Sequence, residues 1–255
     1  MTISEKTSSV SAPGPNLRKA LTGLALLATA ALAGCGPAPV PTGINDPHEA
    51  QNRQFHAFNV DLDRALLRPA GKVYVKAVPS PVEVGISHFA SNLDLPGMVL
   101  NDLLQLNLNG AAQNSLRFVV NSTVGLGGIL DPASAGGLPA APTDFGATLN
   151  AWGMPEGSYI EMPVLGPTTD RDLIGSIVDF VINPVRIFAP KPWPTVDLAA
   201  GVATKIGDRG RYSATVDSIL YDSADGYAQE RLFYLENRRY KLGQKSNTFE
   251  DPYAQ

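Results

Sequence analysis

Cysteine is almost absent from this chain of 255 residues, in which Cys35 is the only one. A single thiol excludes a disulfide within the chain. A hydrophobic run of spanning length is also missing, because the apolar stretch at residues 20–33 is shorter than the roughly 20 residues that cross a bilayer. Strand-like alternation is scarce as well, and residues 159–164 are the best candidate. These absences favour a mainly α, single-domain protein.

The N-terminal segment has the composition of an export signal. Arg18 and Lys19 precede an uncharged stretch that runs from residue 20 to residue 45. A basic region, an apolar region and small residues before a break are typical of such signals. The cysteine that follows Ala-Gly resembles a bacterial lipobox, which implies cleavage before Cys35 and acylation of that residue with a diacylglycerol and a further acyl chain. Residues 1–34 are therefore predicted to be a lipoprotein signal peptide.

The residues after the cleavage site bear on which membrane holds the protein. Residues 35–44 are predicted to form a lipidated Pro/Gly tether, and stable anchoring takes at least two acyl chains, which an acylated Cys35 would supply. In enteric lipoprotein sorting, an aspartate after the cysteine typically retains the protein in the inner membrane. Gly36 stands at that position instead, which favours the outer membrane.

The charge of the mature chain argues against nucleic acid as a partner. Residues 1–34 carry three of the 20 basic and one of the 24 acidic residues, so the remainder has 17 basic and 23 acidic residues and a net charge of −6. Nucleic-acid binding needs a basic stripe. Adhesion to anionic headgroups by charge alone is equally disfavoured.

Proline-containing capping patterns predict the first helices of the mature chain. Asp46, Pro47 and Glu49 have the order of a capping box with proline at the first helical position, and predict a helix that continues to about Leu67 and is ended by Pro69. The same device, from Ser80 to Glu83, predicts a second helix. The apolar stripes behind the two capping boxes are Phe55, Phe58, Leu62 and Leu66, and Val82, Ile86, Phe89 and Leu93.

Further helices are predicted along the rest of the chain at residues 97–106, at 110–121, from Thr169 to before Pro184, and at 225–242. The helical domain is predicted to cover residues 45–242, followed by a polar C-terminal tail at 243–255.

An unusual stretch lies at residues 118–143, where Asp131 is the only charged residue. Glycines and polar side chains interrupt it, so a spanning helix is excluded. Two interpretations remain open: a segment that contacts lipid in the plane of the membrane or as a re-entrant element, and a buried hairpin of a water-soluble core.

Catalytic and metal-binding patterns are weak. His48, His56 and His88 do not have the HExxH spacing, and no metal partner is evident for them in the sequence. No serine lies in a complete GxSxG or Ser-x-x-Lys pattern. Carboxylate pairs such as Asp61 and Asp63 do not share a helical face and are interpreted as solvated or capping charges. The sequence predicts no enzyme, metal or cofactor.

A series of motifs resembles the MlaA (VacJ) family, in order and over nearly the whole mature chain from Asn45 to about Tyr240. The motifs are Asn45-Asp46-Pro47-x-Glu49-x-x-Asn52-Arg53-x-Phe55-x-x-Phe58-Asn59, Leu62-Asp63-Arg64, Leu67-Arg68-Pro69, Asn92-Leu93 with Pro96, Asn101-Asp102-Leu103-Leu104-Gln105, the run from Arg117 to Asp131, the run from Asp144 to Leu149, Trp152-Gly153, and Pro163-Val164-Leu165-Gly166-Pro167 with Arg171-Asp172. The chain departs from the family pattern at residues 155–159 and 226–227.

The resemblance implies a fold and a function. Members of this family are outer-membrane lipoproteins in which amphipathic helices lie in the plane of the inner leaflet, at the periplasmic face, and form a ring with a short hairpin. Mislocalised phospholipids pass from the outer leaflet through an amphipathic channel to a periplasmic lipid carrier (MlaC-like), and the protein associates with an outer-membrane porin trimer. The alternative is a structural lipoprotein that braces porins or the envelope and moves no lipid.

The resemblance also points to individual residues. Phe58 and Asn59 match a family segment near the channel mouth, where shortening is thought to deregulate lipid flow. Gly153 and Gly157 are expected to flank a hairpin beside the channel. Family positions that could meet lipid phosphate, although structural ion pairs are the competing interpretation, are Arg53, Arg64, Arg68 and Arg117.

Overall fold

The computed structural model describes residues 36–244. The predicted signal peptide, Cys35 and most of the predicted tail therefore lie outside the described residues. All described helices and strands belong to one compact unit that begins at Pro37. The predicted tether packs on this unit, because Ala38 is buried and its N–H donates to the carbonyl oxygen of Asn150 at 2.9 Å.

The described chain is mainly helical with one short hairpin, as predicted. The elements are α2 (Glu49–Leu62), a π-helical turn η1 (Asp63–Leu67), α3 (Arg68–Ala77), α4 (Ser80–Leu104), α5 (Leu108–Thr123), α6 (Pro132–Ala135), α7 (Phe145–Ala151), β1 (Tyr159–Met162), β2 (Gly166–Thr169), α8 (Asp170–Ile182), α9 (Pro184–Phe188), α10 (Trp193–Arg211), α11 (Ser213–Leu220) and α12 (Gly226–Lys241).

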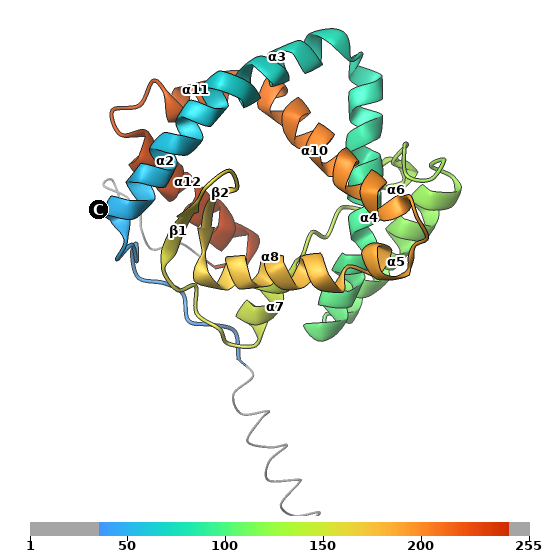
Figure 1. Cartoon of the computed structure of the whole chain (residues 1–255). Helices are drawn as coiled ribbons and strands as arrows, with labels where there is room; N and C mark the ends of the chain where they lie inside the picture. The colour runs from blue at the N-terminus through green and yellow to red at the C-terminus, as the bar shows by residue number, and fades with distance from the viewer. Residues whose placement is uncertain (1–35, 245–255) are drawn as a thin grey trace, which may run out of the picture. The chain divides into compact units, whose positions relative to one another are not determined.

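These elements contact one another in a closed circuit. Figure 1 shows α2, α3, α4 and α8 as the sides of a ring, with the hairpin beside α2 and α10 running from α3 to α4. The circuit continues from α4 through α7 to α8, from α8 to β2, and from β1 back to α2. The ring-like arrangement that the family resemblance implies is therefore present in the ribbon.

The first predicted helix does not end at Pro69. It passes through η1 and continues as α3, with Pro69 in the first turn of α3. The N–H of Arg68 donates to the carbonyl oxygen of Asp63, which is the i to i−5 bond of a π turn. Proline lacks an N–H, and the first turn of a helical segment is where that N–H would have no partner within the helix. Pro69 therefore removes no required hydrogen bond there. The prediction failed because Pro69 was interpreted as the end of a helix and not as the first turn of a new segment.

Two of the capping predictions were also wrong. Helix α2 has His48 at its N-cap without a side-chain cap, and Asp46 instead bonds to Asn52, Tyr227 and Arg231. Helix α4 likewise has no side-chain cap, and Glu83 pairs with an arginine of α10. Both carboxylates are used for long-range contacts, which local sequence patterns do not reveal.

Helix α4 replaces two predicted helices. It runs unbroken for 25 residues with Pro96 inside, so the predicted helix at 97–106 is its second half. Contacts with α5 on one side and α10 on another hold the two halves in line.

The predicted starts of two helices are confirmed. In the structure Thr169 caps α8 by accepting from the N–H of Asp172 at 3.3 Å, and Asp225 caps α12 by accepting from the N–H of Ala228 at 3.1 Å. The strand predicted at 159–164 is β1, which pairs antiparallel with β2. A small apolar core beside this hairpin consists of Tyr159, Tyr227 and Leu235, with Tyr234 packed against it.

The first and last helices of the domain are joined side by side. Asp46 accepts from Tyr227 Oη and Arg231 Nη1, and Arg53 forms a bidentate pair with Asp225 at 3.0 and 2.8 Å. The ring therefore closes between the two ends of the sequence of the domain.

Candidate functional site

The distribution of polar and apolar side chains is inverted relative to a water-soluble domain. Among the described residues, 19 polar or charged residues are buried, against ten buried apolar residues, and 31 large apolar side chains are exposed. Monomeric soluble proteins rarely expose contiguous apolar surface beyond a few hundred Å². A surface of this kind is typical of a lipid or protein interaction site.

Individual helices show the inversion. Helix α2 buries Asn52 and His56 at i, i+4 spacing, whereas Phe58 on its apolar stripe is 49% exposed. Helix α8 buries Arg171 and Asp172. Its exposed face carries Ile174, Ile177, Phe180 and Val181. The apolar stripe of α2 was predicted correctly, but Phe58 and Leu66 on it point outward, and the polar faces of α2 and α8 point inward.

Helix α5 and the loop after it show which side chains of the uncharged stretch are buried, and this bears on its two interpretations. Asn121 and Asp131 lie inside, where Asn121 Nδ2 donates to Asp131 Oδ1 at 2.9 Å. The apolar side chains lie outside, with Val119 56%, Val124 68% and Leu126 68% exposed. A buried hairpin of a water-soluble core is therefore wrong, and the exposed apolar face agrees with the lipid-contact interpretation.

Asn59 fastens the hairpin to α2. Its Nδ2 donates to Glu161 Oε1 at 2.7 Å and to the carbonyl oxygen of Met162 at 3.0 Å. Its Oδ1 accepts from the N–H of Val164 at 2.7 Å, at the turn between β1 and β2. One side chain thus holds the tip of the hairpin, while the neighbouring Phe58 faces outward.

The hairpin lies elsewhere than the sequence predicted. Gly153 and Gly157 both precede Tyr159, so they do not flank it. Both have positive φ, +92° and +78°, which glycine adopts without strain. Sequence reasoning missed the real tip, where Val164 has φ +71° and Leu165 is 76% exposed. The signal available was Pro163 before Gly166, a turn composition within the recognised motif.

The four arginines predicted as phosphate contacts are all in ion pairs. Arg68 pairs with Asp217 at 2.7 Å and the buried Arg117 pairs with Asp131 at 2.9 Å. Hydrogen bonds, first those from Ser134, hold the pKa of Asp131 below its usual range although burial alone would raise it.

The other two arginines share one location. Arg53 and Arg64 both line an open pocket of about 510 Å³ between α2 and the start of α12. Arg64 is 60% exposed, lies 3.2 Å from Asp61 and has its guanidinium 5.1 Å from the ring centroid of Tyr221. The structure therefore brings these two together, and a phosphate there would compete with surface carboxylates.

Asp63, interpreted from the sequence as a solvated or capping charge, is buried. It accepts from Arg209 Nε and Nη2, both at 2.7 Å, and from Tyr221 Oη at 2.6 Å. Its partners lie about 150 residues away in the sequence, which is why the spacing of the local carboxylates did not reveal them.

A cavity with mixed lining lies among α4, α7, α8 and α12. Its volume is about 350 Å³. Its lining combines apolar Met98, Ile182 and Leu242 with charged Asp94, Asp179, Arg238 and Lys241. Such a lining can accept both an acyl chain and a polar group.

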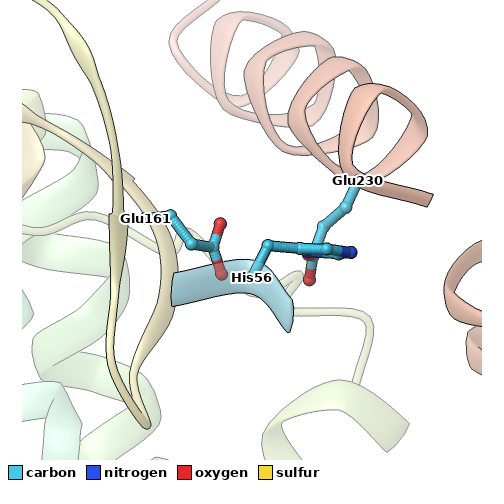
Figure 2. Close-up of side chains that lie close together, drawn as sticks. All are labelled: His56, Glu161 and Glu230. Carbon is cyan, nitrogen blue, oxygen red and sulfur yellow. The ribbon is translucent and has the colours of Figure 1, made fainter. Parts of the chain in front are cut away.

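A cluster of one histidine and two glutamates lies where α2, β1 and α12 meet. His56, Glu161 and Glu230 place their ligand-type atoms within 4.8 Å of one another (Figure 2). His56 Nδ1 lies 2.8 Å from Glu230 Oε2. Burial raises the pKa of Glu161, and hydrogen bonds from Tyr159 and Asn59 partly offset that effect. The sequence offered no partner for His56, because both glutamates are more than 100 residues away.

No described helix is both long and apolar enough to cross a membrane. The exposed apolar side chains are spread over helices that lie around the ring, among them α2, α5, α8 and α10.

Comparison with known proteins gives a consistent result. The sequence profile of the MlaA lipoprotein family matches residues 44–241. The chain is 32% identical over 225 residues to the intermembrane phospholipid transport system lipoprotein MlaA of Haemophilus influenzae, covering 86% of this chain and 88% of that protein. It is 30% identical over 236 residues to the protein of the same name from Escherichia coli K12, covering 90% and 92%.

The fold also matches a solved structure. A chain from a study of the structural basis for maintenance of bacterial outer membrane lipid asymmetry superposes with a TM-score of 0.66 and 29% identity, covering 77% of this chain and 98% of that chain.

Proposed function

Because the chain belongs to the MlaA lipoprotein family, we propose that it is an outer-membrane lipoprotein of a Gram-negative bacterium that takes part in intermembrane phospholipid transport. In this function it passes mislocalised phospholipids from the outer leaflet through an amphipathic path to a periplasmic carrier. It does so beside a porin trimer, and no covalent bond changes. Related proteins named for this transport support the proposal.

The observation that carries the proposal is the inverted burial pattern. A phospholipid that moves between leaflets must take a charged headgroup past hydrocarbon, which is costly without compensation. A ring with an apolar exterior can lie among acyl chains. Its polar interior can hold the headgroup, so the barrier falls without chemistry.

The apolar faces support embedding in the inner leaflet at the periplasmic side. Exposed side chains on α5, α8 and α9 include Val119, Phe180 and Phe188. Acylated Cys35 then serves to deliver the protein to the correct membrane, while the helices hold the domain in the bilayer. A variant without Cys35 should lose sorting but still bind phospholipid vesicles.

The lipid path is proposed to use the cavity among α4, α7, α8 and α12. The hairpin and Phe58–Asn59 do not line this cavity and are proposed to control the mouth of the path. The mixed lining of this cavity suits an amphipathic lipid. Arg53 and Arg64 are proposed as first contacts for lipid phosphate at the open pocket beside the start of α12, because Arg64 is largely exposed.

The proposed path can be tested by filling it. Gly97 lines the cavity, and a Cβ added there meets no atom within 4 Å. Gly97→Trp should fold normally and slow phospholipid transfer from porin-containing outer-membrane vesicles to the purified carrier at least several-fold. Gly201→Trp on α10 is the matched control, since its Cβ also has open space. Equal transfer by both variants would contradict this path.

The function itself is tested by deleting the gene. Surface-exposed phospholipid and sensitivity to detergent should rise, and an unchanged outer leaflet would contradict the proposal. The transfer assay also distinguishes the alternative, a lipoprotein that only braces porins, because that protein would bind porin and transfer no lipid.

A further inference from the structure

The strongest feature outside the proposed lipid path is the cluster of His56, Glu161 and Glu230. The three residues come from the first helix of the domain, the hairpin and the last helix, and their side chains point toward one another (Figure 2). Nothing in the transport function requires them to meet. Their convergence from distant parts of the sequence therefore needs its own physical reason.

The burial of Glu161 is the central observation. Its side chain is fully buried, and both oxygens accept hydrogen bonds from uncharged donors: Tyr159 Oη at 2.6 Å and Asn59 Nδ2 at 2.7 Å. Among residues 36–244, no lysine or arginine lies within ion-pair distance of it. Buried charges in proteins are paired or coordinate a metal.

Protonation of Glu161 would remove the charge but leaves the geometry unexplained. In the structure both oxygens accept, one from Tyr159 Oη and one from Asn59 Nδ2, which is the arrangement that suits an ionised carboxylate. A second carboxylate, Glu230, lies close by and adds negative charge to the same place. Two carboxylates near one imidazole are therefore a group of ligands that suits a cation.

We propose that His56, Glu161 and Glu230 form a binding site for a divalent first-row transition ion such as Zn²⁺. Imidazole nitrogen and carboxylate oxygen are common ligands of this class of ion, at about 2.0–2.2 Å. The donor atoms must draw in from their present separations. The 2.8 Å contact between His56 and Glu230 is replaced by two bonds to the metal, with loss of the shared proton. Three protein ligands leave a fourth position for water.

The surroundings match what a metal site requires. Tyr159 and Asn59 hold the carboxylate of Glu161 in place, which is the role of outer ligand-orienting groups. Tyr227 packs edge-on against the imidazole at 5.7 Å. His56 also lines the open pocket of about 510 Å³, which provides an entry path. A bound ion would join α2, β1 and α12 at the point where the ring closes.

Binding is measured on the full-length lipoprotein in detergent, purified with an affinity tag that lacks histidine and freed of metal with a chelator. Titration with Zn²⁺ alone, followed calorimetrically and by elemental analysis after dialysis, should give one ion per chain. At a hundredfold excess over Kd, the melting temperature should rise by about 5–10 °C, because the ion binds only the folded state.

Variants locate the site. Glu230→Gln and His56→Gln should each weaken Zn²⁺ binding by a factor of about 100 or more. The control variants Glu49→Gln and His48→Gln, at the start of α2 and outside the cluster, should leave Zn²⁺ binding unchanged. Glu230 is only partly buried, so its variant should fold. Absence of stoichiometric binding, or equal binding by cluster and control variants, would overturn the proposal.

Glu161→Gln gives an independent readout. Without metal it removes a buried charge, so it should melt at or above the temperature of the wild type. With Zn²⁺ the order should reverse, because only the wild type gains the ion. An unchanged order with and without Zn²⁺ would also overturn the proposal, while leaving the lipid-transport proposal intact.

Discussion

Replacing Glu156 by glutamine removes the charge partner of a guanidinium that is almost fully buried. Arg239, on α12, is 1% exposed. It donates from Nε to Glu156 Oε2 at 3.0 Å and from Nη2 to Oε1 at 2.7 Å. A third bond goes to the carbonyl oxygen of Gly43 at 2.7 Å. The remaining carboxylate, Glu236, lies 3.7 Å from Nη1, too far for a hydrogen bond.

The expected loss follows from this geometry. Neutralising one partner of a buried pair destabilises a protein by about 3–5 kcal/mol, and here it leaves Glu236, 3.7 Å away, as the remaining carboxylate near the guanidinium. For a domain of this size, 1 kcal/mol lowers the melting temperature by about 2–4 °C. Glu156→Gln should therefore lower it by roughly 6–20 °C.

The assay is thermal unfolding in detergent, followed by circular dichroism at neutral pH. Asp61→Asn is the control, because its pair with Arg64 joins side chains that are 76% and 60% exposed. A surface pair contributes about 0–1 kcal/mol, so this variant should melt within a few degrees of the wild type. The double variant Glu156→Leu/Arg239→Met should recover most of the stability, since no buried charge remains.

Two results would refute the reasoning. Equal melting temperatures for Glu156→Gln and Asp61→Asn would mean that the guanidinium is solvated rather than buried. A double variant less stable than Glu156→Gln would mean that the pair itself, and not the unpaired charge, dominates.

Three further predictions test other features. Gly157→Ala should destabilise the domain by about 1–3 kcal/mol, because φ is +78° and the new Cβ lies 2.7 Å from a neighbouring side chain. Gly97→Ala, in open space within a helix, should instead stabilise the domain by about 0.5–1 kcal/mol, and thermal unfolding measures both changes. Phe188→Ser, at a side chain 80% exposed, should leave the melting temperature unchanged but weaken binding to phospholipid vesicles by about 1.5–3 kcal/mol in a flotation assay. The pKa of Asp225 is lowered to about 2, first by hydrogen bonds from Arg53. The ionised carboxylate therefore stabilises the folded state fully above the usual carboxyl range, and this stabilisation is lost as pH falls toward 2, so Asp225→Asn should flatten the decline of melting temperature between pH 4 and 2.

Local elements could be predicted from the sequence because their signals are local. Thr169 and Asp225 act within one helical turn, and the helices predicted to begin at these residues are present. Helical periodicity also located the apolar stripe of α2. Periodicity fixes which residues share a face, and the solvent decides which face is buried. The orientation therefore could not follow from the pattern alone.

The interior could not be predicted, because its contacts join distant segments. Asp63 meets Arg209 across 146 positions, and His56 meets Glu230 across 174. Asp63 was interpreted as a solvated or capping charge, and no partner was evident for His56, since nothing within a few residues suggested one. The prediction that the first helix ends at Pro69 failed for a different reason. Proline cannot continue a regular α-helix, but it fits the first turn of the segment that follows the π turn.

The junction of α2 with α12 has a consequence for the order of folding. Its contacts connect positions 172 to 185 apart, so the last helix must be available before the first can pair. Loop closure of that length delays such contacts until late in folding. Until then α2 presents unmatched polar groups on one face and apolar side chains on the other. A chain that ends before Gly226 should therefore be degraded as an unfinished domain rather than persist as a shortened ring.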